Sequence, residues 1–458
     1  MTPRHGITDL ESRIPGSPSS SSRRLDPFYD GVWARGQSAQ WRSRRRMVAR
    51  RSAGLGRRVH WFEPSTEDIA RAEHDLHRRS REAKLAVLGA LDGWRTMTIE
   101  QCAALTGIPE ILAGRARIIR DLYALDLMDV GHGEGFSDMQ VQQRDVAEWL
   151  IRPTRSARYE ELIEPRLTYS EALQITGARE WITGGQYDRH NVIATELALQ
   201  LAEHSTAAAV LGERWSGASE LMYEGWGRPD PYPQYAGRGD FTIVRRDGLR
   251  IVVELTASAS GASFEKKVDR WAQRLSADTL TTQGTVVLFI MLEELHPITG
   301  RRGDPKGLYA KVRNQITKSI RKYPGTHESR TGERMFFAQW SELFPDRHTR
   351  GFEFEFLPAY TPAGVYRVDA ENVWDRKLLL SEQEVFYWPA AGDEPTAVVD
   401  NARMFWCTPW WMRQEPAPQI ALPLTRALWP QKIPGVVAGD QRPKGAAGAV
   451  TLPARVVL

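Results

Sequence analysis

The stretch that most constrains this fold is an uncharged run of eight residues, TVVLFIML, at positions 285–292. A short apolar run rich in β-branched residues is typical of a strand that is buried on both faces. Segments 263–275 and 312–320 flank the run, and in both segments apolar residues recur at every third or fourth position. These segments predict amphipathic helices that would cover the strand. The pattern therefore predicts an α/β domain with a mixed sheet.

Two shorter strands are expected just before this region, in the stretch RGDFTIVRRDGLRIVVELT. A three-residue turn ending at Gly248 would join them, because glycine adopts the left-handed conformation at little cost. This turn would place Asp240 directly opposite Glu254 and leave the other face of the hairpin apolar. A two-residue turn would shift the register by one residue and separate the two carboxylates.

Two carboxylates at neighbouring strand positions suggest a cation site. Together with a backbone carbonyl and water, Asp240 and Glu254 would offer the hard oxygen ligands that Mg²⁺ and Mn²⁺ prefer. Such an ion can polarise a phosphodiester and activate water. The alternative is structural: Asp240 simply begins a strand and Glu254 is a solvated strand residue.

Length and composition limit the class of protein. A chain of 458 residues is long enough for two or three domains. Its two cysteines, Cys102 and Cys407, exclude a thiolate zinc site and a disulfide scaffold, and they suit a reducing cytoplasm. The sequence has no apolar run of about 18 residues and no apolar segment near its N-terminus. We therefore expect a cytoplasmic protein that does not contact membranes.

Shifts in composition divide the chain into five parts. Residues 1–62 are rich in arginine, serine and glycine and predict a disordered basic arm. Residues 63–150 predict a helical domain, 151–189 a linker, and 190–355 the α/β domain. Residues 356–458 form an extension rich in tryptophan and proline that ends in a tail. A basic arm with interleaved aromatic residues suits contact with a nucleic-acid backbone, although such runs often only increase solubility.

The helical domain has the element order of a winged helix-turn-helix. Three short helices are expected, with a turn at residues 106–108 between the second and third, followed by a glycine-rich hairpin. In such domains the helix after the turn enters the major groove of DNA. Arg115, Arg117 and Arg120 would be its outward residues. The alternative is a winged helix that binds protein, with solvated arginines.

The α/β domain resembles the PD-(D/E)XK nuclease superfamily, in which an acidic residue begins one strand and Glu ends the next, as Asp240 and Glu254 do here. Placed behind a winged helix, and with His190-Asn191 opening a helix, it looks like the replication-relaxation family of actinobacterial plasmids and mobile elements. The resemblance implies that Asp240 and Glu254 are metal ligands, with Glu196 as a third.

One position departs from the superfamily pattern. A lysine is expected two residues after the Glu, and this chain has Thr256. Some related nucleases take the basic residue from the following helix, which here would be Lys266 or Lys267; otherwise the domain is inactive. Asp230, in Arg-Pro-Asp, matches the literal motif but lies outside any expected strand, so Asp240 is favoured.

These features support three functional hypotheses. The first is a DNA-binding protein of a mobile element, acting in plasmid replication or transfer, that nicks double-stranded DNA with Mg²⁺ or Mn²⁺. The second is a non-catalytic accessory factor that recruits replication or transfer proteins. The third is a protein-interaction role. The sequence has no GxxxxGK[ST] phosphate loop, so no nucleotide cofactor is expected.

Overall fold

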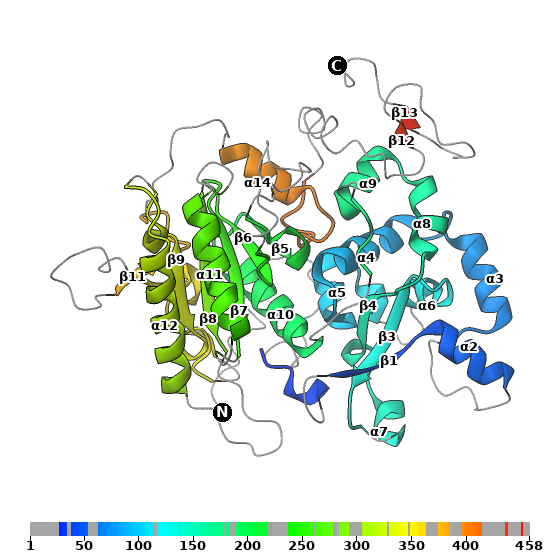
Figure 1. Cartoon of the computed structure of the whole chain (residues 1–458). Coiled ribbons are helices and arrows are strands. Elements are labelled where there is room, and N and C mark those ends of the chain that lie inside the picture. Colours follow the sequence, from blue (N-terminus) through cyan, green and yellow to red (C-terminus); the bar gives the residue numbers. More distant parts are fainter. Residues whose placement is uncertain are drawn as a thin grey trace. The chain divides into compact units, whose positions relative to one another are not determined.

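In the computed structural model the chain folds as two units (Figure 1). The first unit comprises the described residues of Glu11–Glu196 and Met404–Leu458, and the second is built from Leu197–Arg403. The structure describes residues 27–33, 38–53, 63–112, 117–136, 138–177, 179–183, 188–218, 221, 237–257, 259, 262–277, 282, 284–292, 305–327, 329–346, 349–362, 374–384, 386, 395–414, 436–437 and 450–451.

The first unit is mainly helical. Its helices are η1 (Asp30–Val32), α2 (Arg44–Ser52), α3 (Thr66–Asp75), α4 (Arg81–Trp94), α5 (Ile99–Thr106), η2 (Pro109–Leu112), α6 (Arg117–Ala124), α7 (Asp138–Gln143), η3 (Val146–Glu148), α8 (Arg158–Leu162), η4 (Glu164–Arg166), α9 (Tyr169–Thr176) and α10 (Asp188–His204), which continues into the second unit. Its strands are β1 (Ala39–Arg42), β2 (Met97–Thr98), β3 (Met128–Gly133), β4 (Leu150–Pro153), β12 (Val436–Val437) and β13 (Val450–Thr451).

Capping residues set the starts of several helices. Ser65 and Asp68 form a capping box at the start of α3, and Thr98 with Gln101 forms another at the start of α5. Gly107 ends α5 with a φ of 74°, a conformation that favours glycine. Four described strands form an antiparallel sheet in the order β1-β3-β4-β2.

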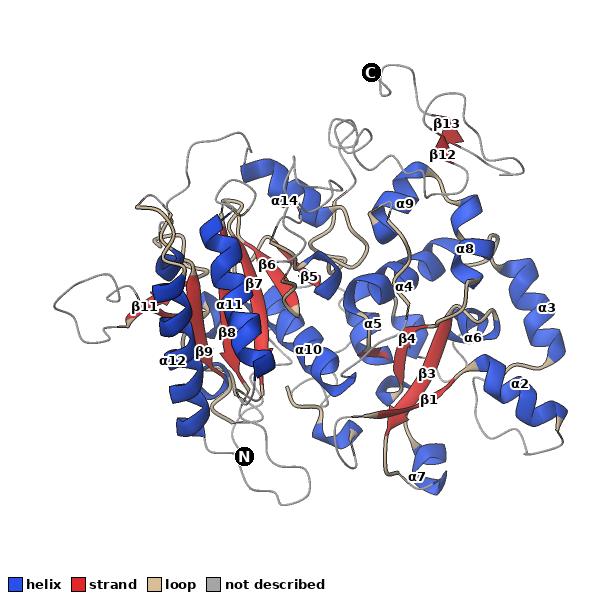
Figure 2. Cartoon of the chain, viewed as in Figure 1, coloured by secondary structure: helices blue, strands red, loops and turns tan. Residues whose placement is uncertain are grey.

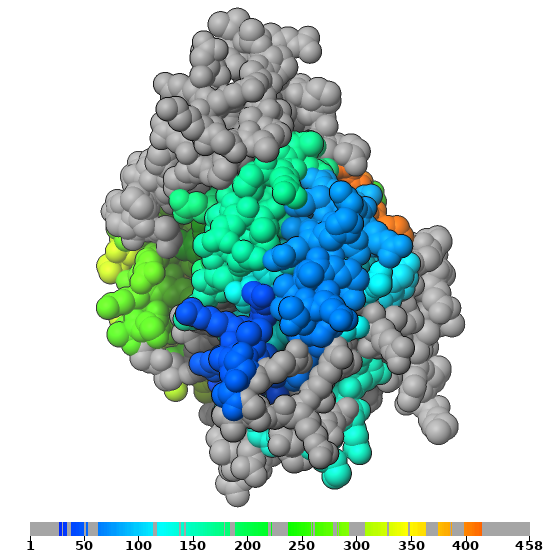
Figure 3. Space-filling model, turned by 90° about the vertical axis from the view of Figure 1, so that its right-hand side faces the viewer, coloured from blue at the N-terminus to red at the C-terminus, as the bar shows by residue number. Residues whose placement is uncertain are grey.

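The expectation of a disordered N-terminal arm is wrong for the described part of residues 27–53. β1 pairs with β3, so that Trp41 lies opposite Gly131, and the Trp41 indole N–H donates to Asp188 Oδ2 at 3.0 Å. Tyr29 is buried and its hydroxyl donates to Glu196 Oε2 at 2.9 Å. In Figure 3 these N-terminal residues, in dark blue, form part of the surface of the molecule. Composition could not predict this order, because the partners of Trp41 and Tyr29 lie 90 or more positions further along the chain.

Removing residues 1–43 should therefore destabilise the first unit. The deletion exposes the edge of β3 and leaves Asp188 and Glu196 without these donors. We expect a loss of about 3 kcal/mol or more, because each orphaned buried polar group costs about 1–3 kcal/mol. Thermal unfolding measures the loss, and deletion of residues 1–26 is the control, since it removes none of these contacts. Equal melting temperatures for the two deletions would contradict the packing of β1.

The predicted linker, residues 151–189, is also not a linker. The domain boundary at residue 150 cuts β4, which lies between β3 and β2 in the sheet. The sequence of residues 146–151 favours a helix locally, but these residues form η3 and the start of β4. α9 packs along α4 and is capped by a box of Thr168 and Glu171. These residues belong to the first unit because pairing with β3 and packing on α4 outweigh the local helical pattern.

The second unit is built on a mixed sheet. Its strands are β5 (Ala209–Gly212), β6 (Phe241–Val244), β7 (Arg250–Thr256), β8 (Thr285–Met291), β9 (Met335–Gln339), β10 (Pro358–Thr361) and β11 (Asp375–Leu378). Its helices are η5 (Glu213–Trp215), α11 (Ala262–Ala277), α12 (Pro305–Lys322), η7 (Thr331–Glu333), α13 (Trp340–Leu343), η8 (Phe354–Phe356) and α14 (Pro395–Arg403). Seven described strands pair in the order β11-β10-β9-β8-β7-β6-β5 (Figure 2).

The pairing directions confirm an α/β unit with a mixed sheet. β7 is parallel to β8 and β8 to β9, whereas the other pairs are antiparallel. The first strand is β5, which precedes the expected hairpin and was not itself expected. β10 and β11 extend the sheet beyond residue 355, where the sequence predicted the domain to end.

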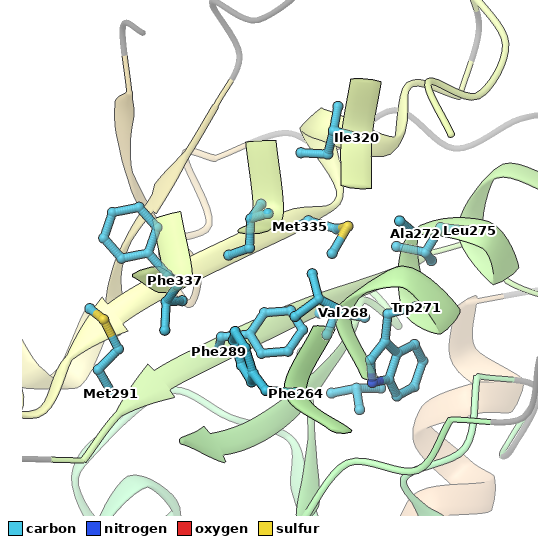
Figure 4. Packing of buried hydrophobic residues seen from close by; sticks show 14 of the residues in the cluster. Phe264, Val268, Trp271, Ala272, Leu275, Phe289, Met291, Ile320, Met335 and Phe337 are labelled. Atoms are coloured by element: carbon cyan, nitrogen blue, oxygen red, sulfur yellow. The ribbon is translucent and has the colours of Figure 1, made fainter. Parts of the chain in front are cut away.

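The central apolar strand and its two helices form the core of this unit. β8 is buried at every position, and α11 and α12 pack against each other and on the β7–β9 part of the sheet. Figure 4 shows Phe264 and Val268 of α11 beside Phe289 of the sheet, and Trp271 and Met335 belong to the same cluster. The i, i+4, i+7 spacing of these α11 residues thus places one helix face on the core, as predicted.

The hairpin has the predicted register. Arg245 and Leu249 flank the turn, where the Arg245 N–H donates to the Leu249 carbonyl at 2.9 Å, and Gly248 has a φ of 81°. Phe241 is paired with Val253 at the end of the ladder. The Asp240 N–H also donates to the Val253 carbonyl, so Asp240 lies beside the Val253–Glu254 part of β7. The expected three-residue turn is therefore confirmed.

The chain returns to the first unit after α14. Residues 404–413, which we call the return segment, contact the first unit. They bond to α9 and α5 through backbone N–H groups and to α4 through the Trp94 side chain. The Trp406 N–H donates to the Gln174 carbonyl at 2.8 Å, and the Trp410 N–H donates to the Leu105 carbonyl at 2.9 Å. The Trp410 ring lies against Gly107, where a Cβ would approach within 2.6 Å. This part of the predicted C-terminal extension is therefore packed on a domain.

Candidate functional site

Glu254 lies near the end of β7 and is completely buried. Its Oε2 accepts a hydrogen bond from Lys267 Nζ at 2.7 Å, and its Oε1 accepts one from the Trp271 indole N–H, also at 2.7 Å. Both donors come from α11, so that helix fixes the orientation of the carboxylate. Trp271 was expected only as a core residue, and its indole nitrogen is a polar contact that the apolar pattern did not reveal.

Asp240 directly precedes β6 and is half-buried. Its Oδ2 accepts a hydrogen bond from the Leu255 N–H at 2.6 Å, and its own N–H donates to the Val253 carbonyl at 2.7 Å. These contacts hold the Asp240 carboxylate beside the backbone of β7, next to Glu254. The structure thus brings together the two acidic residues that the sequence predicts.

The basic residue near this pair is Lys267. Its side chain is 45% exposed, and its Nζ reaches the buried carboxylate of Glu254. Lys266, the other candidate, is exposed on the neighbouring position of the helix. Thr256, at the position where the superfamily has lysine, is buried at the end of β7. Lys267, and not Thr256, therefore places a positive charge beside the acidic pair.

The charges of the site shift one another's protonation. The pKa of Glu254 is raised from 4.5 to about 7 in total: burial raises it most, the Lys267 ammonium lowers it, the Asp240 carboxylate raises it, and the hydrogen bonds from Lys267 and Trp271 lower it. Partial burial lowers the pKa of Lys267, but the carboxylates of Glu254, Asp240 and Glu213 together raise it above its ordinary value. The site therefore attracts cations.

Glu213 is a third carboxylate that the sequence argument missed. It follows β5 directly, and its charge acts on Lys267. The Gly239 N–H donates to the Ser216 carbonyl at 3.3 Å, which ties the chain after Glu213 to the chain before Asp240. A Cβ at Gly239 would lie 2.6 Å from the Val253 carbonyl oxygen, so glycine permits this close approach. Locating β5 correctly would have drawn attention to Glu213.

The donor atoms match a hard divalent cation only in part. Asp240 and Glu254 supply carboxylate oxygens, as Mg²⁺ requires. In the described part of the chain, however, no three His, Cys, Asp or Glu residues form a group that could hold a metal ion. A bound ion would therefore need a backbone carbonyl and several waters to complete its coordination, which is usual for Mg²⁺.

Glu196, the third ligand implied by the resemblance, is buried in the first unit. Its Oε2 accepts hydrogen bonds from the Tyr29 hydroxyl at 2.9 Å and from the Gln101 amide at 3.2 Å. The Gln101 amide also donates to the Val192 carbonyl at 2.8 Å. Glu196 thus holds the N-terminal residues to α5 and α10, and its role as a metal ligand stays a prediction.

The three predicted DNA-binding arginines differ in their surroundings. Arg117 is exposed at the start of α6, and Arg115 lies outside the described residues. Arg120 does not point outward: its side chain is 18% exposed, and its guanidinium donates to Asp68 Oδ2 at 3.2 Å. The expectation that Arg120 is a free outward residue is therefore wrong, because the capping box of α3 places a carboxylate beside it.

Comparisons of the chain with protein-family models, with curated proteins and with solved structures find no match. Among the described helices, none has the length and apolarity needed to cross a bilayer. The fold and the site define a two-unit protein in which one unit has a mixed sheet and a buried carboxylate paired with a lysine.

Proposed function

We propose that this protein binds double-stranded DNA through its first unit and nicks it at the Asp240–Glu254–Lys267 site of its second unit. The observation that carries the proposal is the convergence of these three side chains from the start of β6, the end of β7 and α11. This arrangement is similar to that of PD-(D/E)XK nucleases, and it supports the resemblance to the replication-relaxation family of plasmids and mobile elements.

In the proposed reaction each residue has a separate task. Asp240 and Glu254 would hold Mg²⁺ or Mn²⁺, an ion that polarises the scissile phosphodiester and lowers the pKa of bound water. Trp271 holds the Glu254 carboxylate in one orientation through its indole N–H. The Lys267 ammonium is placed to stabilise negative charge that develops on the phosphate.

The first unit supports the DNA-binding part of the proposal through its topology. The order α4, β2, α5, α6, β3, β4, with β4 paired to both β2 and β3, agrees with a winged helix-turn-helix. We propose that α6 is the recognition helix and that Arg117 is its exposed basic residue. α2, with five arginines among its nine residues, would contact the DNA backbone. Replication or transfer proteins remain the expected protein partners.

A plasmid-nicking assay tests the proposal. Wild-type protein should convert supercoiled plasmid to open circles with Mg²⁺ or Mn²⁺ but not with EDTA. Asp240→Asn and Glu254→Gln should each eliminate nicking, because each removes a ligand charge. Lys267→Ala should lower the rate about 10²-fold or more, the cost typical of a lost charge-stabilising donor. Lys266→Ala is the matched control and should nick at the wild-type rate.

The results also separate the two main hypotheses. A protein carrying both Asp240→Asn and Glu254→Gln that still nicks plasmid would remove the nuclease assignment. The second hypothesis, a non-catalytic DNA-binding factor, is favoured by one observation: Lys267 and Trp271 already provide a donor for each oxygen of Glu254. That hypothesis predicts tight duplex binding without metal-dependent cleavage and without stabilisation by Mg²⁺.

A further inference from the structure

α12 has an unusually one-sided charge. Its 18 residues, PKGLYAKVRNQITKSIRK, contain six lysines or arginines and no aspartate or glutamate. Lys311, Lys318 and Arg321 are exposed. On α11, Lys266 and Arg270 are exposed as well. The outer surface of this helix pair therefore carries a concentrated positive charge, whereas the whole chain has a net charge of only +4.

Three of these side chains form a line along α12. Lys311, Lys318 and Arg321 are at positions i, i+7 and i+10, so they share one face of the helix. We call them the basic stripe. At a rise of about 1.5 Å per residue the stripe is about 15 Å long. The opposite face buries Val312, Ile316 and Ile320 in the core, so the stripe is held rigidly relative to the sheet.

The side chains of the stripe make no ion-pair contact with the carboxylate closest to them on α11. Asp269 of α11 is the acidic residue at the α11–α12 contact, and it pairs with Lys322 Nζ at 3.0 Å and accepts from the Ser319 hydroxyl at 2.5 Å. In the part of the chain that the structure describes, Lys311, Lys318 and Arg321 make no ion pair. Asp269 still attracts Lys318 electrostatically, so the stripe is partly screened. Three cations on one rigid face nevertheless favour an extended anionic partner over a single small anion.

The chemistry of the surface favours a phosphate backbone over a lipid surface. A helix that binds a bilayer inserts large apolar side chains between the lipids. The exposed large apolar side chains of the described residues are Val48, Met139 and Phe352, and none of them lies on α11 or α12. Each strand of a DNA duplex presents one phosphate about every 3.4 Å along the axis, so about four phosphates lie along the length of the stripe.

We propose that the basic stripe is a second duplex-binding surface, which contacts the DNA backbone independently of the first unit. The inference rests on the proposed function, because it assigns the stripe to the same DNA. α11 connects the two sites: Lys267 reaches Glu254 from this helix, and Asp269 joins the helix to α12. Backbone bound along the stripe would therefore be held by the same rigid group of elements that carries the cleavage site.

The test compares two triple variants of the full chain that lose the same net charge. The stripe variant carries Lys311→Gln, Lys318→Gln and Arg321→Gln. The control carries Arg246→Gln, Arg330→Gln and Lys377→Gln, which remove cations of the same unit that are already paired with Glu382, Glu333 and Glu384. Equal melting temperatures would show that all three proteins are equally folded.

Binding to a 24-base-pair DNA duplex is then measured in EDTA at several salt concentrations. Each lost phosphate contact lowers the slope of log K against log salt by about 0.9. The stripe variant should therefore lose about 2.7 units of slope and at least tenfold in affinity at low salt, whereas the control should change by less than one unit. Equal slopes for the two variants would overturn the inference, as would a larger effect on anionic vesicles or on duplex RNA than on DNA.

Measuring binding without metal keeps this inference separate from the cleavage proposal. If the wild-type protein never nicks plasmid but the stripe variant binds DNA more weakly, the nuclease proposal is wrong and the basic stripe still binds DNA. If the wild-type protein nicks plasmid but the stripe variant binds DNA as tightly as the wild type, the nuclease proposal is supported and the stripe is not a DNA-binding surface.

Discussion

Truncation of the chain after Arg403 should unfold the first unit, although the truncation removes only its last segment. The return segment supplies acceptors and ring surface that residues of α4, α5 and α9 require. The Trp94 indole N–H, which is buried, donates to the Cys407 carbonyl at 2.7 Å. Phe405, Cys407 and Met412 are themselves buried. The combined loss should exceed about 5 kcal/mol, which is comparable to the total stability of a small domain.

The measurement is circular dichroism and thermal unfolding of two truncated proteins. Truncation after Gln414 is the control, because it keeps every described contact of residues 404–413. We expect this control to unfold like the full chain. The shorter protein should lose helical signal at a temperature at which the control is folded. If both truncated proteins melt together, the return segment does not stabilise the first unit.

Lys267→Met should destabilise the second unit strongly, and the effect should depend on pH. The pKa of Glu254 in the folded protein, about 7, lies above its ordinary value of 4.5. A carboxyl group with a raised folded-state pKa stabilises the fold fully below pH 4.5, and this stabilisation is lost as the pH rises to about 7. Without Lys267 the pKa of Glu254 rises further, so the loss should continue above pH 7.

The expected difference between the variant and wild type is therefore small at pH 5 and reaches about 3 kcal/mol at pH 8, the cost of leaving a buried charge unpaired. Urea unfolding in EDTA at the two pH values measures it. Glu254→Gln combined with Lys267→Met should restore most of the stability at pH 8, because no buried charge remains. A loss that is equal at pH 5 and pH 8 would mean that Lys267 acts through packing and not through its charge.

The hairpin was predictable from the sequence because its information is local. A glycine at the end of a three-residue turn and the alternation of apolar residues determine the register, and this register brings Asp240 close to Glu254. The sequence also contains the information needed to predict that Lys267, and not Lys266, contacts Glu254. Lys267 is four residues before Trp271, whose burial orients α11, so the two side chains lie on the same side of the helix.

Other parts depended on contacts that no local pattern contains. β1 lies in a segment whose composition is that of a disordered chain, and its hydrogen-bond partners in β3 are about 90 positions away. β4 reads locally as part of a helix, and only its position between β3 and β2 makes it a strand. Arg120 was predicted to face DNA because the sequence does not show that Asp68 lies beside it.

The first unit is built from two separate stretches of the chain, and this affects how it folds during synthesis. A ribosome adds roughly 5–20 residues per second, and Leu197–Arg403 is translated between the two parts of this unit. Synthesis of the intervening segment takes roughly 10–40 s at this rate. During that interval Gly107, Leu105 and the Trp94 indole have no Trp410 or Cys407 to contact. The N-terminal part of the first unit therefore stays incompletely packed until the second unit and the return segment have been translated. During this interval a chaperone that recognises exposed apolar surface would bind it.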